Sequence, residues 1–577
     1  MRMLTLHCDY IKFKPLKKAL KNAEELKDKG EIQVKEPLVV LTAVENGDDS
    51  KTVAQLIAAV KKTSGEVKTR NIVLYPYAHL SSNLAPPDVA LERLVEAEHT
   101  LQKEGYKVVR APFGYYKEFE LKVKGHPLSE LSKEFRAESL AITPKEMIHR
   151  TQEIIEEKYD PKQLLRQISK TKLDSSKLKD NDHRILGQKL DLFSFSEVAP
   201  GMVFWHDKGW TIYNELINFW RDEHKKARYK EISTPQVLDK KLWQISGHWE
   251  KYRNNIFLTD YEGRQFAVKP MNCPGGMLVF KSQQRSYKEL PMRVAELGIV
   301  HRQELSGVLA GLFRVIKFTQ DDAHIYCTEE QLEDEISNVM NLIDILYKKF
   351  NFDYTIELST RPEKRIGSDK LWDKAESILS SVLKKKKIKH KVNEGDGAFY
   401  GPKIDFHIKD SLNRTWQCAT IQLDFAMPER FELEYTDKDG SQKRPIMVHR
   451  AIYGSFERFI GILLEHLNGN LPAWLSPIQV RVLNFTDRNT KAAEKIISQL
   501  KEEIPQLRID SDFRNSTVND KVRDAEMQKI NYVIVIGDKE EKAKTLAVRE
   551  RGNDKPKFGV KIDSFIKDLK EKIEKRV

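Results

Sequence analysis

The segment LFRVIKFTQDDAHIYC, residues 312–327, combines side chains that could bind a ligand or a metal. Its β-rich composition predicts a strand, in which side chains two residues apart lie on one face. That face carries a cation, an aromatic ring, an amide, a carboxylate and an imidazole: Arg314, Phe318, Gln320, Asp322 and His324. A solvent-facing strand would explain the arginine and the aspartate, but not the aligned phenylalanine and histidine. We therefore interpret this face as a ligand-binding surface.

Candidate metal ligands lie far apart in the sequence. The closest pair among the 15 histidines is 17 residues apart, and the four cysteines include no C-x-x-C pair, so any zinc site must be assembled by the fold. Cys273 lies in KPMNCPGGM, where the Pro-Gly-Gly sequence predicts a turn that can project a thiolate. His324 and His449 are further candidates, and Cys327 is a weaker one because it faces away from His324 on a strand. Each of these side chains, taken singly, also fits a structural role.

Two further motifs contain an arginine suited to a nucleotide. HRQE places Arg302 and Glu304 on one face if GIVHRQE is a strand, where the guanidinium could hold a phosphate and the carboxylate could accept from a base. An ordinary cross-strand salt bridge is the more common reason for such a triplet. IYGSFERFIGILLEHL predicts a helix with Gly454 and Arg458 on one face, which leaves room for a flat ligand, although core packing more often explains such a pair.

The elements that must position these residues fall into several domains, as 577 residues predict. Residues 1 to about 140 alternate β-rich runs with amphipathic helices, including one expected over 86–105, and so predict a compact α/β domain. A Lys-, Asp- and Ser-rich stretch then predicts a helical connector and linker over 143–190. After LPAWLSP the alternation of strands and helices restarts, which predicts another α/β unit of about 100 residues.

The overall composition limits the partners and the location. Lys and Arg outnumber Asp and Glu by 98 to 86, a balance that suits a nucleic acid but also fits a merely basic surface. The scattered cysteines indicate a reducing compartment, and we expect a cytoplasmic protein. We expect no association with a membrane, because the first residues contain no apolar core of signal-peptide length and no apolar run reaches 18 residues.

Six ordered segments together carry a family resemblance: KPMNCPGG, HRQELSG, FTQDDAHIYCTEEQ, LSTRPEKRIGSD, GAFYGPKIDF and MVHRAIYGSFERFIGILLEH. The chain resembles the class II aminoacyl-tRNA synthetases and, among them, the archaeal type of the threonyl-tRNA synthetase family, over essentially its whole length. The implied fold is α/β and α+β multidomain: a deacylase-like α/β editing domain over 1–142, a class II antiparallel-sheet catalytic domain over 191–475, and an α/β anticodon-binding domain over 476–577. A homodimer is also implied, formed through the helix and strand that lead to Pro235.

The resemblance implies a threonine–tRNA ligase. Such an enzyme activates L-threonine with ATP and Mg²⁺ to threonyl-adenylate and transfers it to the 3′ end of tRNA(Thr). Arg302 would hold the α-phosphate, Glu304 would meet the adenine amino group, and Phe318 would stack on the base. Arg302, Arg458 and Lys403 are the implied catalytic residues. The full implied ATP set is Arg302, Glu304, Arg314, Phe318, Gln417, Ser455 and Arg458.

One zinc ion per subunit is implied, held by Cys273, His324 and His449 with a position left open for threonine. The implied threonine pocket consists of Gln320, Asp322, Tyr400 and Gln422. A site built for the hydroxyl rejects valine. Serine keeps the hydroxyl and lacks only a methyl group, a difference of about 1 to 3 kcal/mol, so a second sieve, a site that hydrolyses mischarged serine, is expected. One departure is that many relatives have His after the first glycine of MNCPGGM, which leaves the three ligand positions untouched.

The same resemblance assigns that sieve and the tRNA contacts. His79, Tyr116, Lys117 and Glu130 would surround the ester of mischarged seryl-tRNA(Thr), and the H-x-x-x-H pair of bacterial-type editing modules does not occur in the sequence. Asn515, Arg523, Glu540 and Arg549 would read anticodon bases. Structural or solvated roles also fit the lone histidine, the lysine and any single arginine.

Two rival functions remain at this stage. A catalytically silent tRNA-binding regulator would be expected to lose the ATP arginines or the metal ligands, and this sequence retains them. A class II synthetase for another amino acid is disfavoured by the combination of Cys273, His324 and His449.

Overall fold

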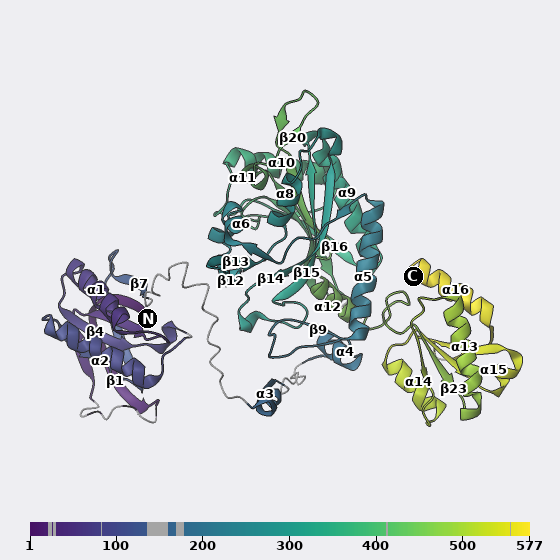
Figure 1. Cartoon of the computed structure of the whole chain (residues 1–577), viewed down its shortest axis with the longest axis horizontal. Helices are drawn as coiled ribbons and strands as arrows, with labels where there is room; N and C mark the ends of the chain where they lie inside the picture. The colour runs from purple at the N-terminus through teal and green to yellow at the C-terminus, as the bar shows by residue number, and fades with distance from the viewer. Residues whose placement is uncertain are drawn as a thin grey trace. The chain divides into compact units, whose positions relative to one another are not determined.

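The computed structural model describes residues 1–20, 23, 26, 30–81, 83–135, 160–168, 178–410, 413–553 and 555–577. The chain divides into two compact units, Met1–Ile155 and Glu156–Val577, which are described separately (Figure 1). Much of the connector predicted over 143–190 lies outside the described residues. Its described parts contain the helices α3 (Pro161–Ile168) and α4 (His183–Lys189).

The first unit is an α/β domain built on one long strand. β1 (Arg2–Lys18) pairs with four other strands, and the sheet follows the order β2-β1-β3-β4-β5. The parallel strands β3, β4 and β5 are linked by the helices α1 (Ser50–Glu66) and α2 (Pro87–Lys103), as parallel connections require. The remaining strands are β2 (Ile32–Lys35), β3 (Leu38–Ala43), β4 (Asn71–Pro76), β5 (Lys107–Arg110), β6 (Tyr115–Val123) and β7 (Glu130–Glu134). The predicted α/β domain is confirmed.

The second unit is organised around an eight-stranded sheet in the order β10-β14-β15-β22-β19-β18-β16-β17. All neighbours are antiparallel except the outermost pair at each edge. The strands are β10 (Lys230–Glu231), β14 (Met292–His301), β15 (Lys317–Cys327), β16 (Asp353–Ser359), β17 (Lys391–Asn393), β18 (Lys403–Lys409), β19 (Thr415–Asp424) and β22 (Ile446–Ala451). This confirms the antiparallel-sheet core expected for the catalytic domain.

Helices cover this sheet and bury its main core. In α5 (Asp207–Lys226), the apolar side chains of Ile212, Leu216, Phe219 and Trp220 form a buried stripe. The helices of this part are α5 (Asp207–Lys226), α6 (Lys240–Ile245), α7 (His248–Lys251), α8 (Cys273–Lys281), α9 (Glu329–Lys348), α10 (Asp369–Lys385), α11 (Ala426–Arg430) and α12 (Phe456–His466). The small strands beside them are β8 (Phe193–Ser194), β9 (Phe204–Trp205), β11 (Val237–Asp239), β12 (Phe257–Tyr261), β13 (Arg264–Val268), β20 (Tyr435–Thr436) and β21 (Gln442–Lys443).

A separate five-stranded sheet follows, in the order β24-β23-β25-β26-β27. Its elements are β23 (Val480–Asn484), α13 (Thr490–Glu503), β24 (Ile509–Asp512), α14 (Val518–Met527), β25 (Tyr532–Ile536), α15 (Asp538–Ala543), β26 (Thr545–Glu550), β27 (Lys557–Lys561) and α16 (Ile562–Glu574). The predicted C-terminal α/β unit is confirmed. Within the described residues, no helix is both long enough and apolar enough to cross a bilayer.

Three local expectations were wrong. The strand expected over residues 312–327 begins only at Lys317, so Arg314 lies in the segment before it rather than on the strand face. Arg302 and Glu304 do not lie on a strand, because β14 ends at His301 and the chain turns into a loop. Gly454 is not part of the helix that contains Arg458, because α12 begins at Phe456 and Gly454 has a φ of 79°. A Cβ at position 454 would also lie 2.6 Å from the carbonyl oxygen of Cys418, so the turn needs a glycine.

Candidate functional site

Three buried side chains from distant parts of the sequence converge on one point. One ligand atom each of Cys273, His324 and His449 lies within 4.8 Å of the others. Cys273 is the first residue of α8, while His324 and His449 face each other across the β15–β22 pair. Their imidazole rings are 5.0 Å apart and nearly perpendicular. A sulfur and two imidazole nitrogens in this arrangement form a donor set that suits a zinc ion.

The surroundings of the cluster also fit a metal. Nε2 of His324 is buried and has no hydrogen-bond partner within the described part of the chain. Burial lowers the pKa of His324 well below its usual value, so this imidazole is neutral, as a metal ligand must be. Nε2 of His449 lies 2.9 Å from a carboxylate oxygen of Asp424, an arrangement that commonly orients a metal-bound histidine. Cys327 is fully buried in the main core instead, as its strand parity predicted.

The residues proposed for threonine surround this cluster. Asp322 is buried, and its carboxylate accepts a 3.2 Å hydrogen bond from the Asn272 amide. Gln422 lies opposite His449 in the β19–β22 register, and the ring of Tyr400 is 5.1 Å from that of His449. Gln320 extends from the same strand as Asp322, two residues away, and lines the neighbouring cavity. The structure therefore places Asp322, Tyr400 and Gln422 beside the Cys-His-His cluster and Gln320 in the wall of the neighbouring cavity.

Lys403 belongs to a polar network beside this pocket. Its ammonium lies 2.9 Å from a carboxylate oxygen of Asp405 and 3.1 Å from one of Asp396. Burial alone would lower the pKa of Lys403, but the two carboxylates outweigh it and raise the pKa, so the side chain stays charged. Asp405 also accepts a 2.6 Å hydrogen bond from Gln417.

A polar cavity of about 480 Å³ lies on the face of β15 that also carries His324, because Phe318 and Gln320 line it. It is lined by Tyr252, Asn255, Arg302, Glu304, Phe313, Arg314, Val315, Phe318, Gln320, Gln417, Cys418, Thr420, Gly454, Ser455 and Arg458. All seven side chains predicted for ATP are among these residues. The sequence pattern did not single out Tyr252 or Asn255, which come from segments with no recognisable motif. It also missed Phe313, because in a strand over 312–327 this residue would lie on the face opposite to Arg314.

The arginines of this cavity are already engaged. The Arg302 guanidinium lies 5.1 Å from the centre of the Phe318 ring, and its Nε donates to the carbonyl of Pro270. Arg314 forms an ion pair with Glu304 at 2.8 Å, so two side chains expected to bind different parts of a nucleotide hold each other in this structure. Arg458 donates through Nε to the carbonyl oxygen of Phe313 at 2.9 Å.

A buried carboxylate fixes the turn that leads to Arg458. Asp321 accepts hydrogen bonds from the backbone N–H groups of Ile452, Tyr453 and Gly454 at 2.9 to 3.0 Å. Burial raises the pKa of Asp321 to about 6. Ser455 then caps α12, because its hydroxyl accepts the N–H of Arg458. Asp321 and Asp322, adjacent on β15, thus support the turn and the pocket respectively.

A further histidine, which the sequence analysis did not predict, lies next to the threonine pocket. His248 is fully buried, its ring lies 5.4 Å from Phe399 and 6.4 Å from Tyr400, and burial lowers its pKa to about 3. Nothing in the spacing around SGHWEK distinguishes this histidine from a structural one.

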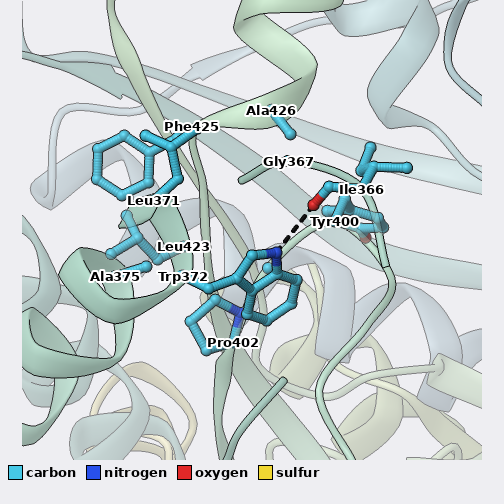
Figure 2. A pocket seen from close by; sticks show the side chains of 11 residues that line it. Ile366, Gly367, Leu371, Trp372, Ala375, Tyr400, Pro402, Leu423, Phe425 and Ala426 are labelled. Atoms are coloured by element: carbon cyan, nitrogen blue, oxygen red, sulfur yellow. Dashed lines mark hydrogen bonds between the residues drawn. The ribbon is translucent and has the colours of Figure 1, made fainter. Parts of the chain in front are cut away.

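A small apolar pocket lies behind Tyr400. Figure 2 shows the side chains that line it, with the Trp372 indole donating to the carbonyl oxygen of Ile366 at 2.8 Å. Leu371, Leu423 and Phe425 line the same pocket, so its wall is largely apolar.

The first unit contains a cavity of its own, of about 520 Å³, lined largely by apolar side chains, several of them aromatic. His79, Tyr116 and Lys117 line it, and of the predicted editing residues that the structure describes, Glu130 alone is not part of the lining. The Lys117 ammonium donates to the carbonyls of Pro112 and Tyr115 and lies 5.2 Å from the centre of the Tyr75 ring.

The four predicted anticodon residues lie on the C-terminal unit. Asn515 and Arg523 are exposed, in the loop after β24 and on α14. Glu540 accepts the N–H of Gly537 at the start of α15, and Arg549 on β26 is paired with Glu526 at 2.8 Å.

Sequence comparisons divide the chain into three matching regions. Residues 1–135 match the family described as the archaea-specific editing domain of threonyl-tRNA synthetase. Residues 255–467 match the class II tRNA synthetase core domain (G, H, P, S and T), and residues 479–572 match an anticodon binding domain.

Individual relatives agree with these matches. The Threonine–tRNA ligase of Caldanaerobacter subterraneus is 53% identical over 395 residues, which are 68% of this chain and 61% of that protein. The chain therefore spans less than two thirds of that relative's length. A solved structure titled as the RNA binding domain of threonyl-tRNA synthetase from Cryptosporidium parvum is 40% identical, with a TM-score of 0.66, and covers 68% of this chain and 98% of its own. A putative threonyl-tRNA synthetase from Aeropyrum pernix is 29% identical, with a TM-score of 0.59, and covers 68% and 96%.

Proposed function

Because the chain belongs to the threonyl-tRNA synthetase family, we propose that it joins L-threonine to the 3′ end of tRNA(Thr) using ATP. The observation that carries this proposal is the placement of a Cys-His-His cluster beside a polar cavity lined by three arginines. An amino acid held at the cluster would lie next to a nucleotide held in the cavity.

In the first step, the threonine carboxylate attacks the α-phosphorus of ATP and pyrophosphate leaves. Two anions must meet, so the cations of the cavity would offset their repulsion and the charge that develops in the transition state. We assign this role to Arg302, Arg314 and Arg458, with Lys403 nearby and Mg²⁺ accompanying the nucleotide. Phe318 would stack on the base, and Glu304 would accept from its amino group once the ion pair with Arg314 opens. Gln417 and Ser455 complete the proposed ATP set.

We propose that Cys273, His324 and His449 hold a zinc ion, one per subunit. When bound, this ion would supply a Lewis acid that ligates the amino and hydroxyl groups of threonine and so excludes valine. Asp322 would pair with the amino group, and Gln320, Tyr400 and Gln422 would close the pocket around the side chain. In the second step, the terminal ribose hydroxyl of the tRNA attacks the activated carbonyl to form the ester, and AMP leaves.

The first unit would supply the second sieve. Serine retains the hydroxyl that the metal recognises, so hydrolysis of seryl-tRNA(Thr) is needed for accuracy. We assign this hydrolysis to the cavity of the first unit that contains His79, Tyr116 and Lys117. Glu130 remains a proposed member of the site and would join it when tRNA binds. The C-terminal sheet would read the anticodon through Asn515, Arg523, Glu540 and Arg549.

Three broader proposals follow from the family. The boundaries at 142, 190 and 475 between the editing domain, the connector, the catalytic domain and the anticodon-binding domain remain our proposal. A homodimer would form through α5 and the strand that leads to Pro235. We also propose that the chain works in the cytoplasm, where tRNA is charged for translation.

The test is ATP–pyrophosphate exchange with each amino acid, before and after chelation of metals. We expect exchange with threonine above all others, lost on chelation and restored by zinc. Strong exchange with proline or glycine instead would redirect the assignment to a sister enzyme.

A further inference from the structure

A second cluster of candidate ligands lies where α4 meets α12. Ligand atoms of Asp182, His183 and Glu465 also lie within 4.8 Å of one another. A metal does not fit here, because Arg184 forms an ion pair with Asp182 and Arg414 forms one with Glu465. Both ring nitrogens of His183 are also engaged. The cluster is therefore a closed hydrogen-bonded network, and it holds the segments to which its side chains are hydrogen-bonded.

His183 connects a loop to a helix. Its Nε2 lies 2.9 Å from the backbone nitrogen of Leu312, and its Nδ1 lies 2.6 Å from Oε1 of Glu465. A backbone N–H can only donate, so Nε2 accepts and the ring proton must be on Nδ1, where Glu465 accepts it. The carboxylate thus fixes the tautomer that the loop requires. The ring is 1% exposed, which keeps water from competing for either bond.

The loop held in this way forms one wall of the proposed ATP cavity. Phe313 and Arg314 follow Leu312 and line the cavity. The Phe313 ring packs against the His183 and Trp416 rings, whose centres lie 4.2 and 4.3 Å from its own centre. Its carbonyl oxygen accepts the Nε–H of Arg458. The position of the Arg458 guanidinium therefore depends on the position of this loop.

One face of α12 is shaped to receive the loop. Arg458, Gly461 and Glu465 are spaced three and four residues apart, so they lie on one side of the helix. A Cβ at Gly461 would be 3.0 Å from the Phe313 ring and 3.1 Å from Cβ of Leu312, so the glycine permits close contact. The loop side has a matching glycine, because a Cβ at Gly311 would be 2.3 Å from Nε2 of His183.

We propose that His183 is a positioning residue that, through Leu312 and Phe313, holds Arg458 in place for ATP. This inference rests on the proposed function, because it assigns a nucleotide to the cavity. It does not concern the amino-acid pocket, so the interaction with threonine should be unaffected.

Two substitutions in the full chain separate the two bonds of the ring. His183→Asn places an amide N–H near the position of Nδ1, so it keeps the hydrogen bond to Glu465 but loses the acceptor for the N–H of Leu312. His183→Gln instead places an acceptor near the position of Nε2, where it can accept that N–H. We expect His183→Asn to raise the KM for ATP in pyrophosphate exchange about tenfold, as the loss of one buried hydrogen bond implies. The KM for threonine should stay within about twofold, and His183→Gln should recover most of the loss.

Two further measurements exclude a merely structural effect. In an Arg458→Ala background, His183→Asn should add little, because residues that act through one another are not additive. Gly461→Ala, which presses on Phe313 without touching His183, should also raise the KM for ATP and keeps the test available if position 183 tolerates no change. The exposed His99 on α2 provides the control, and His99→Asn should behave as wild type.

The inference is overturned if His183→Asn leaves the KM for ATP within twofold of wild type. It is equally overturned if the KM values for ATP and threonine rise by the same factor while the melting temperature falls. A wild-type chain with no threonine-dependent exchange would instead refute the proposed function. Calorimetric titration with ATP would then decide the inference separately, since weaker ATP binding by His183→Asn supports it and equal binding refutes it.

Discussion

The imidazoles of His324 and His449 occupy directly opposed positions on two antiparallel strands, with ring centres 5.0 Å apart. Cys273 approaches the pair from the start of α8. The two histidines are fixed by the sheet register, whereas the cysteine depends on the loop before α8.

Replacing the cysteine should therefore empty the metal site without unfolding the sheet. We expect Cys273→Ala to abolish stoichiometric zinc in elemental analysis and to lower threonine-dependent exchange at least about 100-fold. Loss of a residue that only supports a metal ligand already lowers activity by up to about 100-fold, so loss of a ligand itself should cost at least as much. Cys327→Ala is the matched control, because Cys327 lies three residues from His324 but is buried in the main core. Equal zinc content in the two variants would contradict the assignment.

The carboxylate of Asp321 should matter for stability as well as for ATP. Asp321→Ala leaves three buried N–H groups without their acceptor, and at about 1 kcal/mol or more for each group the expected destabilisation is at least about 3 kcal/mol. Urea unfolding followed by tryptophan fluorescence measures this loss. Asp439→Ala, in the exposed hairpin turn between β20 and β21, should change the stability by less than about 0.5 kcal/mol.

Glu457 should make the stability depend on pH. Burial raises its pKa from 4.5 to about 7 in the folded chain. The folded state then holds the proton more tightly, so this contribution to stability is complete below pH 4.5 and is lost as the pH rises through 7. The loss amounts to about 3 kcal/mol. Melting temperatures between pH 5 and pH 8 should fall less steeply for Glu457→Gln than for wild type, whereas Glu434→Gln, at an exposed position, should reproduce the wild-type slope.

The cavity of the first unit should act on mischarged tRNA only. Lys117→Ala removes a cation from its wall, so we expect threonylation to be intact and Ser-tRNA(Thr) to accumulate. Lys122→Ala, on the same strand and largely exposed, is the control. Unchanged deacylation of Ser-tRNA(Thr) by Lys117→Ala would reject the assignment.

The C-terminal unit should affect tRNA but not activation. Arg523 is exposed on α14, and we expect Arg523→Ala to raise the KM for tRNA(Thr) about tenfold, the effect of losing one good base contact. Threonine-dependent pyrophosphate exchange without tRNA should not change. Lys570→Ala, exposed on α16, tests whether any lost charge has the same effect. Equal losses for both variants would indicate a general electrostatic attraction rather than base reading.

Local periodicity predicted the parts of the site that lie on one element. The strand predicted over residues 312–327 is observed only over 317–327, so the two-residue period correctly placed Phe318, Gln320, Asp322 and His324 on one side and Cys327 on the other. It wrongly included Arg314, which precedes the strand. It did not predict the end of β14 at His301, because Arg302, Gln303 and Glu304, which follow, include no glycine or proline that would mark the end of a strand.

Contacts between distant segments left no local signal. The convergence of Cys273 with the two histidines was expected only through the family resemblance, since spacing alone gave three unconnected candidates. His183 and Glu465 illustrate the same limit, because a hydrogen bond between residues 282 positions apart depends on the packing of two helices. The pairing of Arg314 with Glu304 was also missed, because the fold of the segment between them brings two opposite charges into one cavity.

The three ligand side chains come from α8, β15 and β22, which meet only when the eight-stranded sheet has closed. A partly folded catalytic region would hold the cysteine and the imidazoles too far apart to share an ion, so tight zinc retention would be a property of the finished tertiary structure. The zinc content of a purified sample would therefore serve as an assay of how much of this region is correctly assembled.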